Sequence, residues 1–246
     1  MSASSEADFK RRYTTLQKHL HLKGFRPKTI EAYARGVRRI AGHFDYRIDD
    51  LSAEQLTDYF AGLLETHSWA SVKLDLYGLK FYYEHVLRKP WLHVDLIKPP
   101  RGRHLPDIVT VDEVARLVQS TRVLSYRVLF FTLYSMGLRL GEGLGLTVAD
   151  IDAARRRVHI RDGKGRKDRL VPLPDATLVL LRRFWARHRH PRLLFPNRTG
   201  GLAAAAKAPG PLAPAGVQTT LGKVVQSCGI KKRSPRIAFV TAMQPT

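Results

Sequence analysis

The strongest constraint on the fold is a long series of helical apolar repeats that stops at a proline-rich segment. Between about residue 5 and residue 88, apolar side chains recur every three or four positions, as at Ile30, Tyr33, Val37, Ile40 and Phe44. This is the spacing of one face of a helix. Four such helices without strand-like alternation predict a small helical bundle over residues 1–90.

A change of composition at residues 91–109 divides the chain. This segment carries Pro99, Pro100 and Pro106 among basic residues and lacks helical periodicity, which is typical of an extended interdomain linker. Thr110 and Glu113 then have the spacing of a capping box, which starts a new helix. We therefore expect a second domain over residues 110–235.

The second domain is predicted to be mostly helical with one small antiparallel hairpin. Its hydrophobic periodicity predicts helices over 110–120, 123–137, 175–188 and 216–228, a short helix from about 139, and strands over 157–161 and 168–173. The Ala- and Pro-rich stretch at 200–216 is predicted to be a flexible loop. The fold class is thus mainly α in two domains, a four-helix domain followed by an α+β domain.

The charge balance favours a polyanionic partner. The 42 Lys and Arg residues exceed the 21 Asp and Glu residues and give a formal net charge of +21. Such a surplus repels itself in the compact state, and nucleic acid is the partner that relieves it through counterion release. The alternative is a basic protein from a high-GC genome, in which Arg replaces Lys and the charge carries little meaning.

Cysteine content and hydropathy exclude several classes. Cys228 is the single cysteine, so neither an internal disulfide framework nor a cysteine zinc site is expected. Neither a signal-peptide apolar core nor an apolar run of about 18 residues occurs, so we expect no membrane segment and a cytoplasmic chain. We also expect no metal and no cofactor.

Two segments carry candidate chemistry. Arg139 follows the helix break at Gly137 and lies three residues before Glu142, so a rigidly held guanidinium there would offer fixed donors to a phosphate. The alternative is a surface arginine on an amphipathic helix. The stretch 162–169 crowds basic residues onto a hairpin tip, where Lys164 could act on the same phosphate as an acid or a point charge. The alternative is a solvated basic turn.

These segments resemble the tyrosine recombinase (phage integrase) family. The strongest likeness lies in "MGLRLGEGLGLTVADID" followed by "HIRDGKGRKDRLVPLP". Upstream, "FRPKTIEAYARGVRRIAGHF" resembles the family's core-binding domain, and "KPPRGRHLPDIVTVDEV" resembles its linker. Downstream, "HPRLLFPNRTGG" lies where family members carry a similar segment. The order and spacing of these pieces carry the resemblance.

The resemblance implies site-specific breakage and rejoining of double-stranded DNA through a 3′-phosphotyrosyl intermediate, without a cofactor. Arg139 matches the first active-site arginine, Glu142 the acidic residue that helps to set the site, and Lys164 the hairpin lysine that protonates the leaving oxygen. Lys167 is the alternative for that last role. Phosphate contacts are expected from Arg166 and Arg169 and from a group in the first domain, each of which could equally be a solvated charge: Arg26, Lys28, Arg35, Lys73 and Lys80.

The sequence departs from the family pattern at its end. The family continues with a His-x-x-Arg motif and a nucleophilic tyrosine, whereas the last histidine here is His190 and the last tyrosine is Tyr134. We therefore expect this chain to bind DNA without cleaving it, as a non-catalytic or interfering protein, and do not expect the tetramer that the family forms on DNA.

A frameshift would explain this departure. One synonymous codon choice for residues 236–245 spells His-Ser-Leu-Arg-His-Ser-Tyr in a shifted frame. Our hypothesis is that residues 236–246 are out of frame. An RNA-binding protein is the weaker alternative, because the aromatic strand motifs of single-strand readers are missing. Another alternative is a chain that folds poorly.

Overall fold

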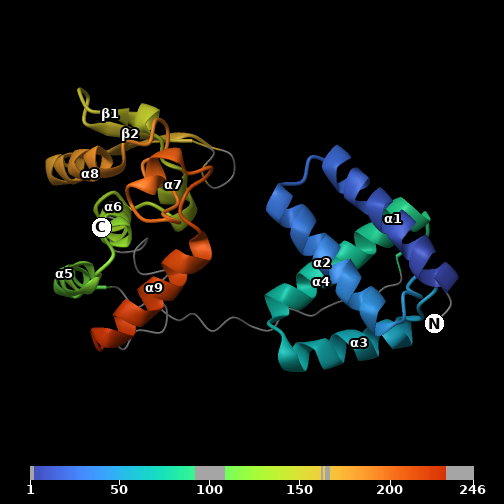
Figure 1. The fold of residues 1–246 in the computed structure, drawn as a ribbon. Helices are drawn as coiled ribbons and strands as arrows, with labels where there is room; N and C mark the ends of the chain where they lie inside the picture. Colours follow the sequence, from blue (N-terminus) through green and yellow to red (C-terminus); the bar gives the residue numbers. More distant parts are fainter. Residues whose placement is uncertain (1–2, 92–108, 162, 164–166, 231–246) are drawn as a thin grey trace. The chain divides into compact units, whose positions relative to one another are not determined.

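The computed structural model describes residues 3–91, 109–161, 163 and 167–230. It divides the chain into two compact units, Met1–Gly102 and Arg103–Thr246, which we call the first and second unit (Figure 1). Most of the predicted linker at 91–109 and the predicted out-of-frame tail at 236–246 lie outside the described residues. Among the described residues, no helix is both long and apolar enough to span a membrane.

Residues 3–91 of the first unit form a bundle of four helices, as predicted. These are α1 (Ala3–Leu22), α2 (Pro27–His43), α3 (Ala53–Thr66) and α4 (Trp69–Tyr82), which continues into the π-helical turn Tyr83–Leu87. The predicted face of α2 supplies Ile30, Val37 and Ile40 to the core, and each is at most 6% exposed. Tyr33 and Phe44 pack against the edge of that core. Helical periodicity therefore located the buried face correctly.

Helices α2 and α4 cross at close range because a glycine from each lies at the contact (Figure 1). A Cβ atom on Gly36 would lie 2.8 Å from Cα of Asp75, and one on Gly78 would lie 2.8 Å from the carbonyl oxygen of Tyr33. Asp75 is buried at this crossing, and Arg39 forms an ion pair with it at 3.1 Å. Burial raises the pKa of Asp75, and the Arg39 charge opposes that shift.

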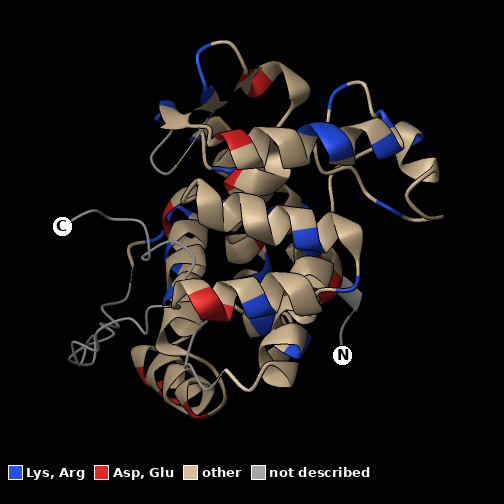
Figure 2. Ribbon diagram, turned by 90° about the vertical axis from the view of Figure 1, so that its left-hand side faces the viewer, with Lys and Arg blue, Asp and Glu red and all other residues tan. Residues whose placement is uncertain are grey.

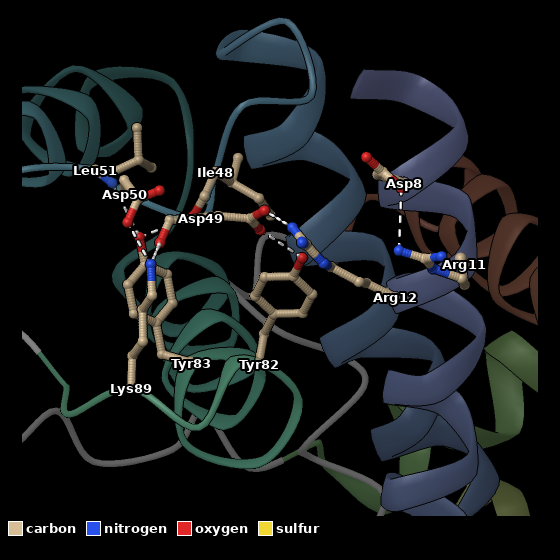
Figure 3. A network of polar contacts seen from close by, with 10 residues as sticks. All are labelled: Asp8, Arg11, Arg12, Ile48, Asp49, Asp50, Leu51, Tyr82, Tyr83 and Lys89. Carbon is tan, nitrogen blue, oxygen red and sulfur yellow. Dashed lines mark hydrogen bonds and ion pairs between the residues drawn. The ribbon is translucent and has the colours of Figure 1, made fainter. Parts of the chain in front are cut away.

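A polar network joins α1, the loop after α2 and the end of α4 (Figure 3). Asp49 pairs with Arg12 and accepts a hydrogen bond from the Tyr82 hydroxyl at 2.9 Å. The Tyr83 hydroxyl donates to the carbonyl oxygen of Ile48 at 2.8 Å and accepts from the Leu51 N–H at 3.2 Å. These bonds satisfy buried backbone groups of the loop, which otherwise carry a desolvation cost.

The second unit combines helices with a small antiparallel sheet. Its helices are α5 (Val111–Ser120), α6 (Leu124–Ser135), α7 (Leu140–Gly145), α8 (Asp175–His188) and α9 (Pro214–Ser227). The sheet has the order β1 (Ile151–Asp152), β2 (Arg157–Ile160), β3 (Arg169–Pro172), with Val158 opposite Val171 and Ile160 opposite Arg169. Val158 and Ile160 point into the core of this unit. The predicted α+β class is confirmed.

Two details of the second unit differ from the prediction. The predicted strand pair gains β1, a two-residue strand that follows the 3₁₀ turn Val148–Asp150 and pairs with β2. The predicted flexible loop at 200–216 contains the 3₁₀ turn Ala204–Lys207, and it buries Ala205 and Leu212 to 1% exposure. Apolar residues of this loop are therefore part of the core of the second unit, which the composition of the loop did not indicate.

Candidate functional site

Arg139 is positioned by the tight reversal between α6 and α7. Gly137 has a φ of +60°, and the Leu138 N–H donates to the Leu133 carbonyl oxygen at 2.9 Å. Such a left-handed glycine ends a helix without Cβ strain. Leu138 and Leu144 on either side are buried, so the backbone of Arg139 is held by its apolar neighbours. Its side chain is 46% exposed, so the guanidinium stays open to solvent while its backbone is held.

The Glu142 carboxylate is the centre of the site. Its oxygens accept hydrogen bonds from the Arg139 N–H at 2.8 Å and from Arg139 Nη1 at 3.0 Å. They also accept two parallel bonds from Arg169 Nη1 and Nη2, both at 2.8 Å. The Glu142 side chain is only 8% exposed. One buried carboxylate therefore joins the start of α7 to strand β3.

The electrostatics of Glu142 follow from this geometry. Burial raises the pKa of the carboxyl group, but the hydrogen bonds from Arg169 and Arg139 outweigh burial and lower the pKa from 4.5 to about 2. Glu142 is therefore a carboxylate at neutral pH and carries a full negative charge between two guanidinium groups. The hydrogen bonds that Arg169 donates to Glu142 in turn raise the pKa of Arg169.

The hairpin between β2 and β3 is described in part. Lys164 and Arg166 lie outside the described residues, so their predicted roles stay predictions. Gly163 is buried, and a Cβ atom there would lie 2.9 Å from the Lys167 carbonyl oxygen and 3.2 Å from Arg169 Nη1. Lys167 itself is exposed. The described part of the hairpin thus packs directly on the Arg169 guanidinium.

Two further polar pairs, at and beside the sheet, were not predicted from the sequence. His159 Nε2 lies 2.9 Å from Asp168 Oδ2, and Arg161 Nε donates to Asp150 Oδ1 at 2.7 Å. Asp150 is 6% exposed and also accepts hydrogen bonds from Thr147. These partners are 9 to 11 residues apart in the sequence, so only the strand register could have revealed them.

The five predicted phosphate contacts of the first unit lie on or next to two helices. Arg26 directly precedes α2, Lys28 and Arg35 lie on α2, and Lys73 and Lys80 lie on α4. The first three are exposed, and the last two are half-buried. Since α2 and α4 pack together, this group belongs to one pair of neighbouring helices. Lys and Arg residues are spread over several helices of the chain (Figure 2).

Lys73 is held in a way that a solvated lysine is not. Its ammonium lies 5.0 Å from the ring centroid of Trp69 and 5.1 Å from that of Tyr77, one helical turn away on either side. Both distances are within the range of cation–π attraction. Within the described ranges, no group of three His, Cys, Asp or Glu residues is placed to hold a metal ion.

Family models match both units. The model of the phage integrase family matches residues 107–240, and the model of the phage integrase N-terminal SAM-like domain matches residues 13–93. An integrase/recombinase of Sinorhizobium fredii is 30% identical over 189 residues, which cover 76% of this chain and 61% of that protein. The tyrosine recombinase XerD of Pseudomonas aeruginosa is 30% identical over 200 residues, which cover 72% and 66%.

Solved structures share the fold at low sequence identity. A lambda integrase tetramer bound to a Holliday junction matches with a TM-score of 0.65 and 15% identity, covering 94% of this chain and 70% of that one. The XerH recombinase bound to its difH substrate matches with a TM-score of 0.61 and 17% identity, covering 86% and 65%. The chain spans less than two thirds of the length of the curated relatives described above.

Proposed function

Because the chain belongs to the phage integrase family, the tyrosine recombinases, we propose that it binds double-stranded DNA at a recombination site and holds one backbone phosphate beside Arg139. The observation that carries the proposal is the state of Arg139. Its backbone and one guanidinium nitrogen are fixed, while its side chain stays 46% exposed. A preoriented cation with open donors is what binding of a phosphate requires.

In a family member that carries the nucleophilic tyrosine, the chemistry at this phosphate would be strand exchange. Arg139 would stabilise the charge that develops on the phosphate oxygens. Lys164, or Lys167 in its place, would give a proton to the 5′-oxygen that leaves when a tyrosine oxygen forms its bond to phosphorus. Glu142 contacts Arg139 and would act by orienting it.

We propose that the 246-residue polypeptide binds DNA and does not cleave it. Its last tyrosine, Tyr134, lies on α6, partly buried against the core of the second unit, where it supports the fold. A polypeptide without the attacking group has no covalent catalysis, however well it holds the phosphate. The polypeptide would then act as an occupant of recombination sites that hinders an active relative.

The grouping of basic residues on α2 and α4 supports a second part of the proposal. Arg26, Lys28, Arg35, Lys73 and Lys80 would neutralise phosphates of the same duplex. Contacts of this kind release counterions, so the logarithm of the binding constant falls with the logarithm of salt concentration by about 0.9 per phosphate contacted. They position the protein without specifying sequence.

The test is fluorescence anisotropy with a labelled duplex over a range of KCl concentrations. A variant in which all five basic residues are changed to glutamine should have a slope of log binding constant against log salt that is smaller by several units. The control Lys18→Gln, on the exposed side of α1, should leave this salt slope nearly unchanged. Equal slopes for all three proteins would contradict the DNA contacts. Unchanged hydrogen exchange in α2 and α4 would confirm that the variant folds.

Covalent chemistry is tested separately. A duplex with a nick near the exchange site traps a covalent complex when a recombinase cleaves it. We expect wild-type protein to yield no DNA adduct that survives denaturation, and such an adduct would contradict the non-cleaving part of the proposal. Sequencing the gene through codons 230–250 tests the frameshift hypothesis, since bases that cannot spell His-x-x-Arg in the shifted frame exclude it.

A further inference from the structure

We propose that Arg169 is a positioning residue which, through Glu142, holds Arg139 and the hairpin backbone at Gly163 in one arrangement. This differs from the direct phosphate contact that the sequence predicts for Arg169. The inference rests on the proposed function, because the phosphate held by Arg139 gives the arrangement its purpose. It concerns how these residues are arranged before any chemical step takes place.

The geometry of the Glu142–Arg169 pair carries the proposal. Arg169 uses both Nη atoms in parallel hydrogen bonds of 2.8 Å to the two carboxylate oxygens. This bidentate arrangement fixes direction as well as distance, which a lysine could not do. The same carboxylate also accepts the two bonds from Arg139. The orientation of Arg139 therefore depends on a residue 30 positions away in the sequence.

The pair also reaches the hairpin tip. Gly163 packs against it so closely that a Cβ atom would lie 3.2 Å from Arg169 Nη1 and 3.5 Å from Glu142 Oε1. The Glu142–Arg169 pair thus holds the hairpin backbone at Gly163.

Charge balance explains why Arg169 is needed. With Arg169 in place, the two bonds to Arg139 leave much of that guanidinium exposed. Without Arg169, Glu142 would be a nearly buried carboxylate with Arg139 as its sole remaining partner among the contacts described above, and a buried charge that loses a partner is costly. Glu142 would then compete with the DNA phosphate for Arg139. Removing the Glu142 charge as well would relieve that competition.

A double-mutant cycle tests this reasoning. We expect Arg169→Met to weaken binding of a duplex by at least about fivefold. Arg169→Met combined with Glu142→Gln should recover part of the loss, because the competing charge is gone while the orienting bonds from Arg169 stay lost. The salt slope should stay unchanged in Arg169→Met. Additive losses in the double variant, together with a slope reduced by about 0.9, would show a direct phosphate contact and overturn the proposal.

The conservative variant Arg169→Lys separates charge from geometry. It keeps a positive partner for Glu142 and loses the parallel pair of hydrogen bonds, so it should bind DNA more weakly than the wild type and less weakly than Arg169→Met. Binding equal to that of the wild type would overturn the positioning role, because a point charge would then suffice.

A readout without DNA distinguishes failure of this inference from failure of the proposed function. Carboxyl chemical shifts measured by NMR in the free protein should place the Glu142 titration near pH 2 in the wild type and clearly higher in Arg169→Met. Amide exchange at Gly163 and in β3 should also become faster in that variant. If both stay unchanged, the inference is wrong whatever the protein binds. If the wild type does not bind duplex DNA, but the Glu142 titration and the amide exchange both change in Arg169→Met, the positioning role is supported and the proposed function is wrong.

Discussion

The contact between α2 and α4 yields a sharp prediction at Gly78. Replacing Gly78 with alanine places a Cβ atom 2.8 Å from the Tyr33 carbonyl oxygen, 3.1 Å from its Cα and 3.3 Å from its carbonyl carbon. All three are backbone atoms of the facing helix. They cannot move aside as a flexible side chain could, so the two helices must separate.

The magnitude follows from two opposing effects. An alanine in a helix interior is better than a glycine by roughly 0.5–1 kcal/mol. Overpacking a tight contact costs about 1–3 kcal/mol, and a contact to backbone belongs at the upper end. We expect Gly78→Ala to destabilise the first unit by about 1–2 kcal/mol.

A matched control is available on α3. A Cβ atom on Gly62 meets no atom within 4 Å, so Gly62→Ala should gain the helix propensity alone, roughly 0.5–1 kcal/mol. The two glycine-to-alanine changes should therefore move stability in opposite directions. This contrast removes the general effect of the substitution from the comparison.

The assay is urea unfolding followed by pulsed hydrogen exchange and mass spectrometry. Peptides from α2 and α4 report on the first unit, and peptides from α6 and α8 report on the second unit, which should unfold at the same urea concentration in all variants. If Gly78→Ala proves as stable as Gly62→Ala, the close approach of the two backbones is wrong.

Two further predictions concern buried polar groups. Glu142→Gln should lower the stability of the second unit at pH 6 by about 2 kcal/mol, less than the full pKa shift implies because both arginines are partly solvated. The folded-state pKa of about 2 lies below the ordinary 4.5, so the difference from wild type should shrink as the pH falls from 4.5 to 2, and a constant difference in urea titrations would contradict the charge argument. Tyr83→Phe removes the hydroxyl that serves Ile48 and Leu51 and should cost the first unit about 1–3 kcal/mol in the same assay. The exposed Tyr77→Phe should cost little, and equal effects would contradict the role of the network.

Much of the fold was predictable because helices are local. A helical face repeats within a few residues, so Ile30, Val37 and Ile40 marked the buried side of α2 without knowledge of its partner. The capping box at Thr110 acts across three residues, and it forms as the spacing predicted. The position of Arg139 after a glycine break followed from the same short-range rules.

The sequence by itself determined the helices, the two units, the basic charge and the resemblance that leads to DNA. Only the tertiary structure decided what surrounds the candidate site. Glu142 and Arg169 are 27 residues apart, and their contact depends on the register of β3 against β2 and on the packing of α7. Gly36 and Gly78 are likewise required only because α2 and α4 cross where they lie. Local periodicity is set by neighbouring residues in the chain. A bidentate ion pair instead requires that folding bring two segments distant in the sequence next to each other.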